Sequence, residues 1–253
     1  MPDLHDPKWF ETWFDSPHYH KLYGHRSQGE AQGFISHLHG HMGWSSLDLL
    51  DLACGQGRHA AAAAQLGHHV VGIDLSPNSI VQAKTIHQSE ENLSFQEGDM
   101  RTFDAGQSFD GVLNLFTSFG YFDEPQDQLT VLKQIKKHLR PGGFLILDFL
   151  NLNKSKNQLV PEEIIARSGT TYRIQREFGP FNPTMKGFTK TIAFEEGGQT
   201  HTFQERVAGL DKNTLETMLS QTGFSMTECF GDYDLSPWHS ENSPRLILSA
   251  TAQ

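Results

Sequence analysis

Two glycines and two acidic residues between positions 51 and 74 have the types and spacing of a nucleotide-type binding site. Gly55 and Gly57 follow the apolar run 47–53, and the alanine-rich stretch 60–66 comes next, which predicts a strand, a tight turn and a helix. Glycines in such a turn let the backbone approach a cofactor closely, although the same turn also serves tight packing. Asp74 ends the next predicted strand, where its carboxylate can accept hydrogen bonds from both hydroxyls of a ribose.

An acid at position 74 fits either a nicotinamide dinucleotide or S-adenosylmethionine. The dinucleotide pattern has a third glycine where this chain has Ala60, and because alanine can substitute, that position leaves both cofactors open. Asp51, four residues before Gly55, is more informative. A carboxylate there would repel a pyrophosphate, whereas the ammonium group of a methionine moiety needs a counter-charge. The charge therefore favours S-adenosylmethionine.

The elements around these residues alternate between apolar runs of strand length and helical stretches, the pattern of a mostly parallel sheet covered on both faces. The predicted strands are 47–53, 69–74, 93–97, 109–115, 144–150, 226–233 and 245–250. The predicted helices are 60–66, 77–88, 124–139 and 211–221, and Ser76-Pro77 supplies an N-cap with proline at the first helical position. Alternating stretches at 171–178, 187–195 and 200–207 predict a small antiparallel insertion.

Composition limits the class of protein and its partners. Lys and Arg total 20 against 30 Asp and Glu, and the formal charge of −10 would repel a phosphate backbone, so we expect no nucleic-acid partner. No stretch approaches the ~20 apolar residues of a membrane span, and the first residues show no secretory signal, so we expect no membrane partner and a cytoplasmic location. Cys54 and Cys229 are too few for a disulfide framework and are interpreted as reduced thiols.

Five segments in order resemble the motifs of the class I S-adenosylmethionine-dependent methyltransferases. They are LLDLACGQGR at 49–58, VGIDLS at 71–76, GDM at 98–100, FDGV at 109–112 and LRPGG at 139–143. The resemblance implies a Rossmann-like α/β fold. Its doubly wound sheet would have seven strands with the last one antiparallel, and here the small antiparallel β insertion would follow the fifth strand.

The same resemblance implies which residues hold the cofactor. Gly55 and Gly57 would line its methionine part, and Asp74 would hold its ribose. Asp99 and the backbone of Met100 would read the edge of its adenine. The predicted cofactor-binding residues of the core are Asp51, Ala53, Cys54, Gly55, Gly57, Asp74, Leu75, Asp99 and Met100, with Asn114 and Leu115 beside the methionine end.

We expect three regions along the chain. Residues 1–45 would form an N-terminal helical cap segment, residues 46–151 and 208–253 the Rossmann-like core, and residues 152–207 the insertion, as a lid or wall for the substrate. In similar small-molecule methyltransferases the N-terminal segment folds over the cofactor, where an aromatic residue or an arginine can contact the methionine carboxylate. We therefore predict this contact for Tyr23 and Arg26. The aromatic residues of this segment can equally pack on the core, and the two roles are compatible.

The sequence assigns no catalytic residue. A sulfonium is already activated for displacement, so the protein must mainly align the acceptor with the methyl group and exclude water, and a base is needed only when the acceptor arrives protonated or as a hydroxyl. Neither an Asn/Asp-Pro-Pro-Tyr sequence nor a cysteine follows the fourth strand. This disfavours methyltransferases of exocyclic DNA amines and of glutamine, and it removes the covalent 5-methylcytosine mechanism. His37, His39 and His41 alternate, but on a helix they would point to different faces, so we interpret them as surface histidines and expect no metal.

The sequence therefore predicts transfer of a methyl group from S-adenosylmethionine to N or O of a small-molecule acceptor by direct in-line displacement. One alternative is a catalytically silent S-adenosylmethionine-binding protein that regulates a partner. A second is an NAD-dependent oxidoreductase, which Asp51 and the lack of a Tyr-x-x-x-Lys sequence disfavour.

Overall fold

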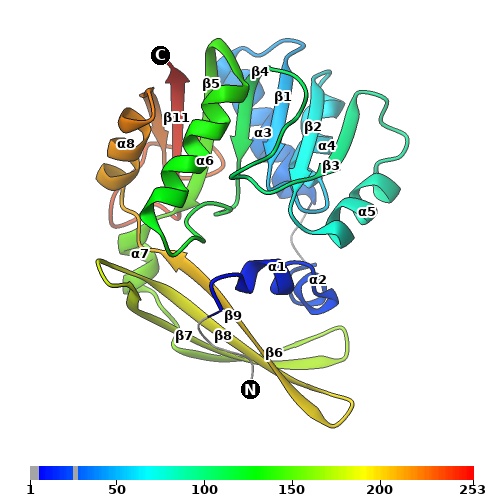
Figure 1. Ribbon diagram of the computed structural model, residues 1–253, viewed down its shortest axis with the longest axis vertical. Coiled ribbons are helices and arrows are strands. Elements are labelled where there is room, and N and C mark those ends of the chain that lie inside the picture. Colours follow the sequence, from blue (N-terminus) through cyan, green and yellow to red (C-terminus); the bar gives the residue numbers. More distant parts are fainter. Residues whose placement is uncertain (1–5, 25–27) are drawn as a thin grey trace.

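The computed structural model describes residues 6–24 and 28–253, which form a seven-stranded sheet and a separate four-stranded sheet (Figure 1). The larger sheet has the order β10-β11-β5-β4-β1-β2-β3. Its strands are β1 (Asp48–Leu52), β2 (His69–Asp74), β3 (Leu93–Glu97), β4 (Phe109–Asn114), β5 (Leu139–Leu150), β10 (Phe224–Phe230) and β11 (Arg245–Ala252). β11 pairs antiparallel with both β10 and β5, whereas β1 to β5 pair parallel. The predicted fold class, including the reversed last strand, is confirmed.

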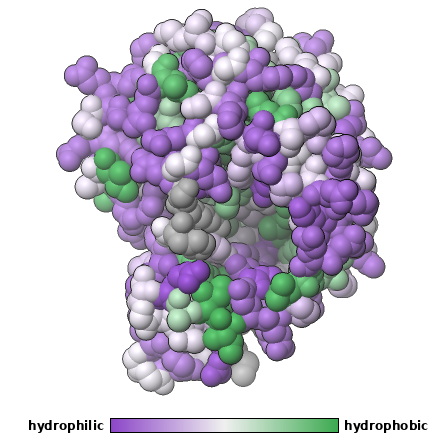
Figure 2. Space-filling model, turned by 180° about the vertical axis from the view of Figure 1, so that it is seen from behind, coloured by the Kyte–Doolittle hydropathy of each residue, from purple (hydrophilic) through white to green (hydrophobic). Residues whose placement is uncertain are grey.

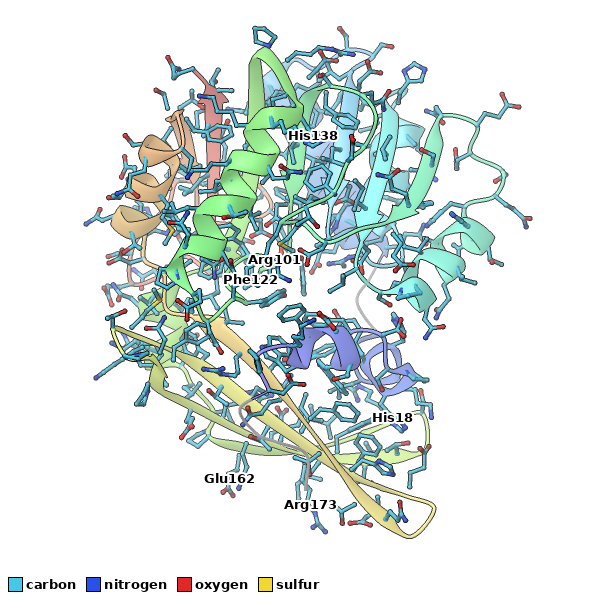
Figure 3. The ribbon with its side chains drawn as sticks, in the orientation of Figure 1. His18, Arg101, Phe122, His138, Glu162 and Arg173 are labelled. Carbon is cyan, nitrogen blue, oxygen red and sulfur yellow. The ribbon has the colours of Figure 1, made fainter. Side chains whose placement is uncertain are left out.

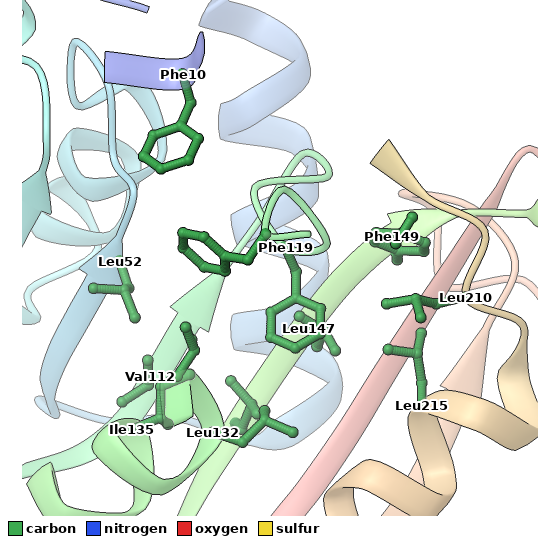
Figure 4. Close-up of a cluster of buried hydrophobic side chains, with 14 of the residues drawn as sticks. Phe10, Leu52, Val112, Phe119, Leu132, Ile135, Leu147, Phe149, Leu210 and Leu215 are labelled. Carbon is green, nitrogen blue, oxygen red and sulfur yellow. The ribbon is translucent and has the colours of Figure 1, made fainter. Parts of the chain in front are cut away.

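Helices cover both faces of the larger sheet because its strands are apolar on both sides. In β5, Leu145 and Leu147 pack on one face and Ile146 on the other. The first face meets α6 (Pro125–His138) and α8 (Lys212–Gln221), and Figure 4 shows Leu132 and Ile135 of α6 beside the strands. The second face meets α3 (Gln28–Met42), α4 (Arg58–Gln65) and α5 (Pro77–Ile86), which Ser76 caps as predicted.

The four-stranded sheet follows α7 (Leu152–Asn157) and is antiparallel throughout. Its strands are β6 (Glu162–Arg167), β7 (Thr170–Asn182), β8 (Met185–Glu196) and β9 (Gln199–Ala208). Alternation predicted the last three. It missed β6, an edge strand paired only with β7, because both of its faces are largely exposed and Ile164 is 71% exposed.

Two short helices, α1 (Trp9–Trp13) and α2 (Pro17–Tyr23), lie between the two sheets (Figure 1). Trp13 is fully buried on the insertion side. On the core side, Asp15 accepts hydrogen bonds from Ser76 Oγ (2.7 Å) and Asn78 N (2.9 Å) at the start of α5. The segment therefore contacts the smaller sheet on one side and the start of α5 on the other.

In the larger sheet, two predicted strand boundaries differ from the structure by three residues or more. The strand expected at 144–150 begins at Leu139, because Leu139 already pairs with Phe109 before a register shift at the glycines that follow. The strand expected at 226–233 ends at Phe230, and Tyr233 belongs to the next segment. Among the described helices, none has the length and apolar character that crossing a membrane requires.

Candidate functional site

The carboxyl ends of β1 and β4 open into a cavity of about 420 Å3, which α1, α2 and β9 close from the opposite side. A smaller cavity of about 90 Å3 lies at the ends of β2 and β3. Figure 2 shows, from behind, the hollow between the larger and the smaller part of the molecule. The two cavities adjoin, because they share six lining residues: Phe14, Tyr19, Ala53, Gly55, Ser118 and Tyr121.

Asp51 lines the larger cavity from near the end of β1 and is 1% exposed. Its Oδ2 accepts a hydrogen bond from Ala60 N (3.1 Å) in the first turn of α4. Burial raises the pKa of Asp51 to about 7, and repulsion from Asp74 adds to the rise, while the Ala60 bond and Arg58 oppose it. An approaching cation stabilises such a carboxylate strongly, which is what the predicted ammonium contact requires.

The glycine turn directs one glycine toward the cavities and the other toward the core. Gly55 (φ +56°) lines both cavities, and a Cβ atom there would have no described atom within 4 Å. Gly57 (φ +80°) precedes α4, and a Cβ atom there would collide with the ring of Phe95. Asp74 fixes the turn, since its Oδ2 accepts from Gly55 N (2.7 Å) and its Oδ1 from Ser76 N (2.9 Å).

The smaller cavity brings together the residues predicted for the ribose and the adenine: Asp74, Leu75, Asp99 and Met100. Arg101 holds the Asp99 carboxylate, with Nη2 2.6 Å from Oδ2 and Nε 3.1 Å from Oδ1. Burial pushes the pKa of Asp99 up, but the hydrogen bonds and charge of Arg101 outweigh it and hold that pKa below its usual value. Arg101 lies 4.5 Å above the ring of Phe122, and Figure 3 shows the two side chains together. Asp99 is thus a fixed, ionised acceptor at this cavity.

Three more predicted residues line the larger cavity, namely Ala53, Cys54 and Leu115. Burial, and then the charges of Asp51 and Asp74, raise the pKa of the Cys54 thiol well above its usual value. The thiol is therefore neutral and a poor nucleophile.

Two predicted residues lie behind the cavity wall, and one cannot be placed. Asn114 is fully buried and donates from Nδ2 to the carbonyl of Leu52 (3.0 Å). Neither Asn114 nor Gly57 is among the described residues that line the two cavities. Arg26 lies outside the described residues, so its proposed contact stays a prediction.

Four side chains from α1, α2, β8 and β9 meet at the wall opposite the core. Glu205 Oε1 accepts hydrogen bonds from Tyr23 Oη (2.6 Å) and Trp13 Nε1 (2.7 Å). Lys190 Nζ lies 3.4 Å from Glu205 Oε2 and also donates to Tyr23 Oη. Tyr23 was predicted to contact the methionine carboxylate. Its hydroxyl donates here to Glu205, and the predicted contact is left as a prediction.

Three further residues line the larger cavity without having been assigned a role from the sequence. Arg58, directly after the glycine turn, lies 4.7 Å above the ring of Phe116, and its position in the motif was the available signal. Burial, and then the charge of Arg58, lower the pKa of His59 to about 3, and burial also lowers the pKa of His20. Both imidazoles are therefore neutral at physiological pH and do not repel a cation.

The loop after β4 borders the larger cavity in a strained conformation. Phe116 and Thr117 both have φ of +60°, in the left-handed region, and with Ser118 they line the cavity. For L-residues this conformation costs ~1–2 kcal/mol per residue, and a β-branched residue such as Thr117 adopts it rarely. Contacts elsewhere in the fold must compensate for this cost.

The three alternating histidines of α3 each contact a different part of the molecule. They bond in three directions: His37 Nδ1 to the carbonyl of Tyr233 (2.8 Å), His39 Nδ1 to His68 Nε2 (3.0 Å) and His41 Nε2 to Glu228 Oε1 (2.8 Å). Within residues 6–24 and 28–253, no group of three His, Cys, Asp or Glu side chains is arranged to hold a metal ion.

Comparison with known proteins identifies similar chains among the methyltransferases. The family described as "Methyltransferase domain" matches residues 49–143. The cypemycin N-terminal methyltransferase of a Streptomyces species is 30% identical over 229 residues, covering 85% of this chain and 88% of that protein. A ubiquinone biosynthesis O-methyltransferase of Cereibacter sphaeroides is 32% identical over 130 residues. This second match covers 50% of this chain and spans only 51% of the relative.

Solved structures agree on the fold. The amino pentose methyltransferase CalS10 of Micromonospora echinaspora, solved with S-adenosylmethionine bound, superposes with a TM-score of 0.67. The match covers 94% of this chain and 98% of that one, at 20% sequence identity.

Proposed function

Because the chain belongs to the class I S-adenosylmethionine-dependent methyltransferases, we propose that it methylates a small-molecule amine by direct in-line displacement at the methyl group. An oxygen acceptor is the second candidate. One observation carries the proposal: the cavity that Asp51 and Gly55 line from the core side is closed on the other side by aromatic rings around the carboxylate of Glu205. The cofactor and the acceptor would thus approach from opposite walls.

The residues of the core fit S-adenosylmethionine. Asp51 would face its ammonium group as a buried counter-charge, Gly55 would leave room beside it, and Asp74 and Asp99 would offer acceptors for its ribose and adenine. The neutral imidazoles of His20 and His59 avoid repulsion in a site that takes a cation. When bound, S-adenosylmethionine supplies a methyl group on a sulfonium that is already activated for displacement. The chain's own contribution is to orient the acceptor and exclude water.

An amine acceptor fits the opposite wall. The rings of Trp9, Phe14, Tyr19, Tyr23 and Tyr121 line the cavity together with Glu205. Aromatic faces attract an ammonium group, and so does the Glu205 carboxylate, although Lys190 at 3.4 Å offsets part of its charge. An apolar setting lowers the pKa of an amine, so that the amine loses its proton more readily. Glu205 would take the proton that leaves the acceptor nitrogen, so that the nitrogen lone pair would be free to accept the methyl group, with the carbon–sulfur bond broken and S-adenosylhomocysteine released.

A hydroxyl acceptor finds less support in the same wall. It needs a base during the transfer because a neutral hydroxyl is a weak nucleophile. A carboxylate such as Glu205 is a much weaker base than an alkoxide, so it assists a hydroxyl less than it assists an amine, which has a free lone pair once it has lost its proton. His59, with a pKa of about 3, is too weak a base to replace it, and burial lowers the basicity of His20 as well. The two similar proteins do not favour one acceptor atom over the other, because one is named an N-terminal methyltransferase and the other an O-methyltransferase.

A panel of matched amines and alcohols tests the proposal. Each pair shares one carbon skeleton, and formation of S-adenosylhomocysteine is measured by mass spectrometry. We expect turnover with amines. For Glu205→Gln we expect kcat/KM to fall ~10- to 100-fold, with the Kd of S-adenosylhomocysteine within about 2-fold of the wild type. Glu228→Gln is the matched control, since Glu228 bonds to His41 far from the cavity.

Each other outcome identifies a different function. Turnover of alcohols alone would support the O-methyltransferase. Tight binding of S-adenosylhomocysteine with no turnover across amines, hydroxyls and carboxylates would support the silent regulator. The roles of residues 1–45 as a cap and 152–207 as a lid, and the cytoplasmic location, are part of this proposal.

A further inference from the structure

Behind the strained loop after β4 lies a buried polar network of three side chains. Asp148 comes from β5, Arg245 begins β11, and Tyr233 belongs to the segment between β10 and β11. Asp148 is fully buried, and the side chain of Arg245 is 17% exposed. None of the three is among the described residues that line the cavities, so they touch the reaction site only through other residues.

Asp148 holds the backbone of the loop at both strained residues. Its Oδ2 accepts a hydrogen bond from Phe116 N (2.8 Å), and its carbonyl accepts one from Thr117 N (3.0 Å). The first of these bonds is charge-assisted, and such bonds are about twice as strong as neutral ones. Asp148 therefore favours the conformation in which both N–H groups point away from the cavity.

Arg245 and Tyr233 fix Asp148 in turn. Arg245 Nε donates to Asp148 Oδ1 (2.7 Å), while its Nη2 donates to Thr117 Oγ1 (2.8 Å). Tyr233 Oη donates to Asp148 Oδ2 (3.1 Å). The Arg245 guanidinium also lies 5.7 Å from the centre of the Phe116 ring. One planar guanidinium thus contacts the Asp148 carboxylate, the Thr117 hydroxyl and the Phe116 ring. Lysine cannot reproduce this geometry.

We propose that Asp148, Arg245 and Tyr233 are positioning residues for methyl transfer, which hold Phe116 and Thr117 in the left-handed conformation at the edge of the cavity. Two consecutive residues of this kind do not keep such a backbone without outside support. Asp148 of β5 and Arg245 of β11 contact these two residues directly, and Tyr233 acts on them through Asp148. Loss of the network would release the loop into the cavity and misplace the wall against which the acceptor is aligned.

Arg245→Lys tests the network, and the chain offers a matched control. Arg140 also bridges two partners, Asp48 (2.6 Å) and Asp110 (2.7 Å), but at the opposite end of the same sheet. Amide hydrogen exchange is measured on the full chain saturated with S-adenosylhomocysteine. In Arg245→Lys we expect exchange at residues 115–118 to rise ~10-fold or more, with strands β1 and β4 unchanged. In Arg140→Lys the loop should exchange at the wild-type rate.

A second variant separates positioning from general stability. Asparagine tolerates the left-handed region far better than threonine. Adding Thr117→Asn to Arg245→Lys should therefore restore much of the loop's protection, although the bond to Arg245 stays broken. Tyr233→Phe, which removes one hydroxyl, should show a smaller rise in exchange at the same residues.

Kinetics with any acceptor that is turned over provide the catalytic measurement. For Arg245→Lys we expect kcat to fall ~10- to 100-fold, with the Kd of S-adenosylhomocysteine within about 3-fold of the wild type. The inference is wrong if loop exchange in Arg245→Lys equals that in Arg140→Lys, or if exchange rises equally across the whole sheet. The exchange experiment uses S-adenosylhomocysteine alone, so its result is independent of whether the acceptor is an amine.

Discussion

The two halves of the cavity are built in different ways. On the core side, Asp51, Gly55 and Asp74 lie at the ends of two neighbouring parallel strands, within 24 residues of one another. On the opposite side, Glu205 meets Tyr23 across 182 residues of sequence and Trp13 across 192. The core half therefore depends on local chain geometry, and the opposite half on how α1, α2 and the smaller sheet pack against the core.

Because the two halves are built differently, they are suited to recognise different ligands. Backbone groups and carboxylates at strand ends make a fixed site, which suits a cofactor of constant shape. The opposite half can change its lining through substitutions in β8, β9 and α2 without disturbing the core. We infer that the core half determines the methyl donor and the opposite half the acceptor.

Asp74→Ala gives the largest effect expected from this comparison. It removes the proposed acceptor for both ribose hydroxyls and leaves Gly55 N without its 2.7 Å bond. Loss of two charge-assisted bonds should weaken S-adenosylhomocysteine binding by ~100-fold or more, measured by calorimetry. Glu205→Gln, in the opposite half, should leave that affinity nearly unchanged. Equal losses of affinity in the two variants would show that the halves are not separate sites.

The core half could be predicted from the sequence because its signals are local. Strand-length apolar runs located β1 and β2, and the residues after them had to lie at one edge of a parallel sheet. The charge of Asp51 then distinguished two cofactors. The strained loop gave no such signal, because Phe116 and Thr117 are held by Asp148 and Arg245 from elsewhere in the chain.

The opposite half could not be predicted because alternation in a strand does not say which other element covers it. Glu205 lies in a stretch whose strand β9 was expected, yet its side chain is held at the cavity by residues distant in sequence, Trp13, Tyr23 and Lys190. The outer face of the same sheet carries charges too, and Figure 3 shows Glu162 and Arg173 there, away from the cavity. The sequence alone does not distinguish a charged residue at the cavity, such as Glu205, from one on the outer face of the sheet.

Substitutions of the two glycines sharpen the description of the core half. Gly57→Ala would place a methyl group against Phe95 in a left-handed backbone, so we expect the free energy of unfolding to fall by ~2–4 kcal/mol. In Gly55→Ala the added methyl group has no described atom within 4 Å, so we expect the free energy of unfolding to fall by only ~1–2 kcal/mol. The methyl group would project into the proposed cofactor site. Urea unfolding and calorimetry separate the two effects. Similar stability losses would contradict the assignment of Gly57 to packing.

The smallest effect concerns the pH dependence of Asp51, whose pKa burial raises from 3.8 to about 7. The cofactor's ammonium group needs the carboxylate, which is about one-tenth ionised at pH 6 and nine-tenths ionised at pH 8. S-adenosylhomocysteine should therefore bind ~10-fold more tightly at pH 8 than at pH 6. Asp51→Asn, the control, should bind more weakly and without this dependence.

Stability without cofactor should change in the opposite direction over a lower pH window. The folded chain keeps a proton on Asp51 that the unfolded chain releases near its ordinary pKa of 3.8. Because the folded state then binds more protons, this residue's contribution makes the free energy of unfolding fall as the pH rises from about 4 to about 7. The difference between wild type and Asp51→Asn in urea unfolding isolates that contribution. A difference that does not change with pH, together with pH-independent binding, would show that Asp51 is already ionised and has a partner other than the cofactor.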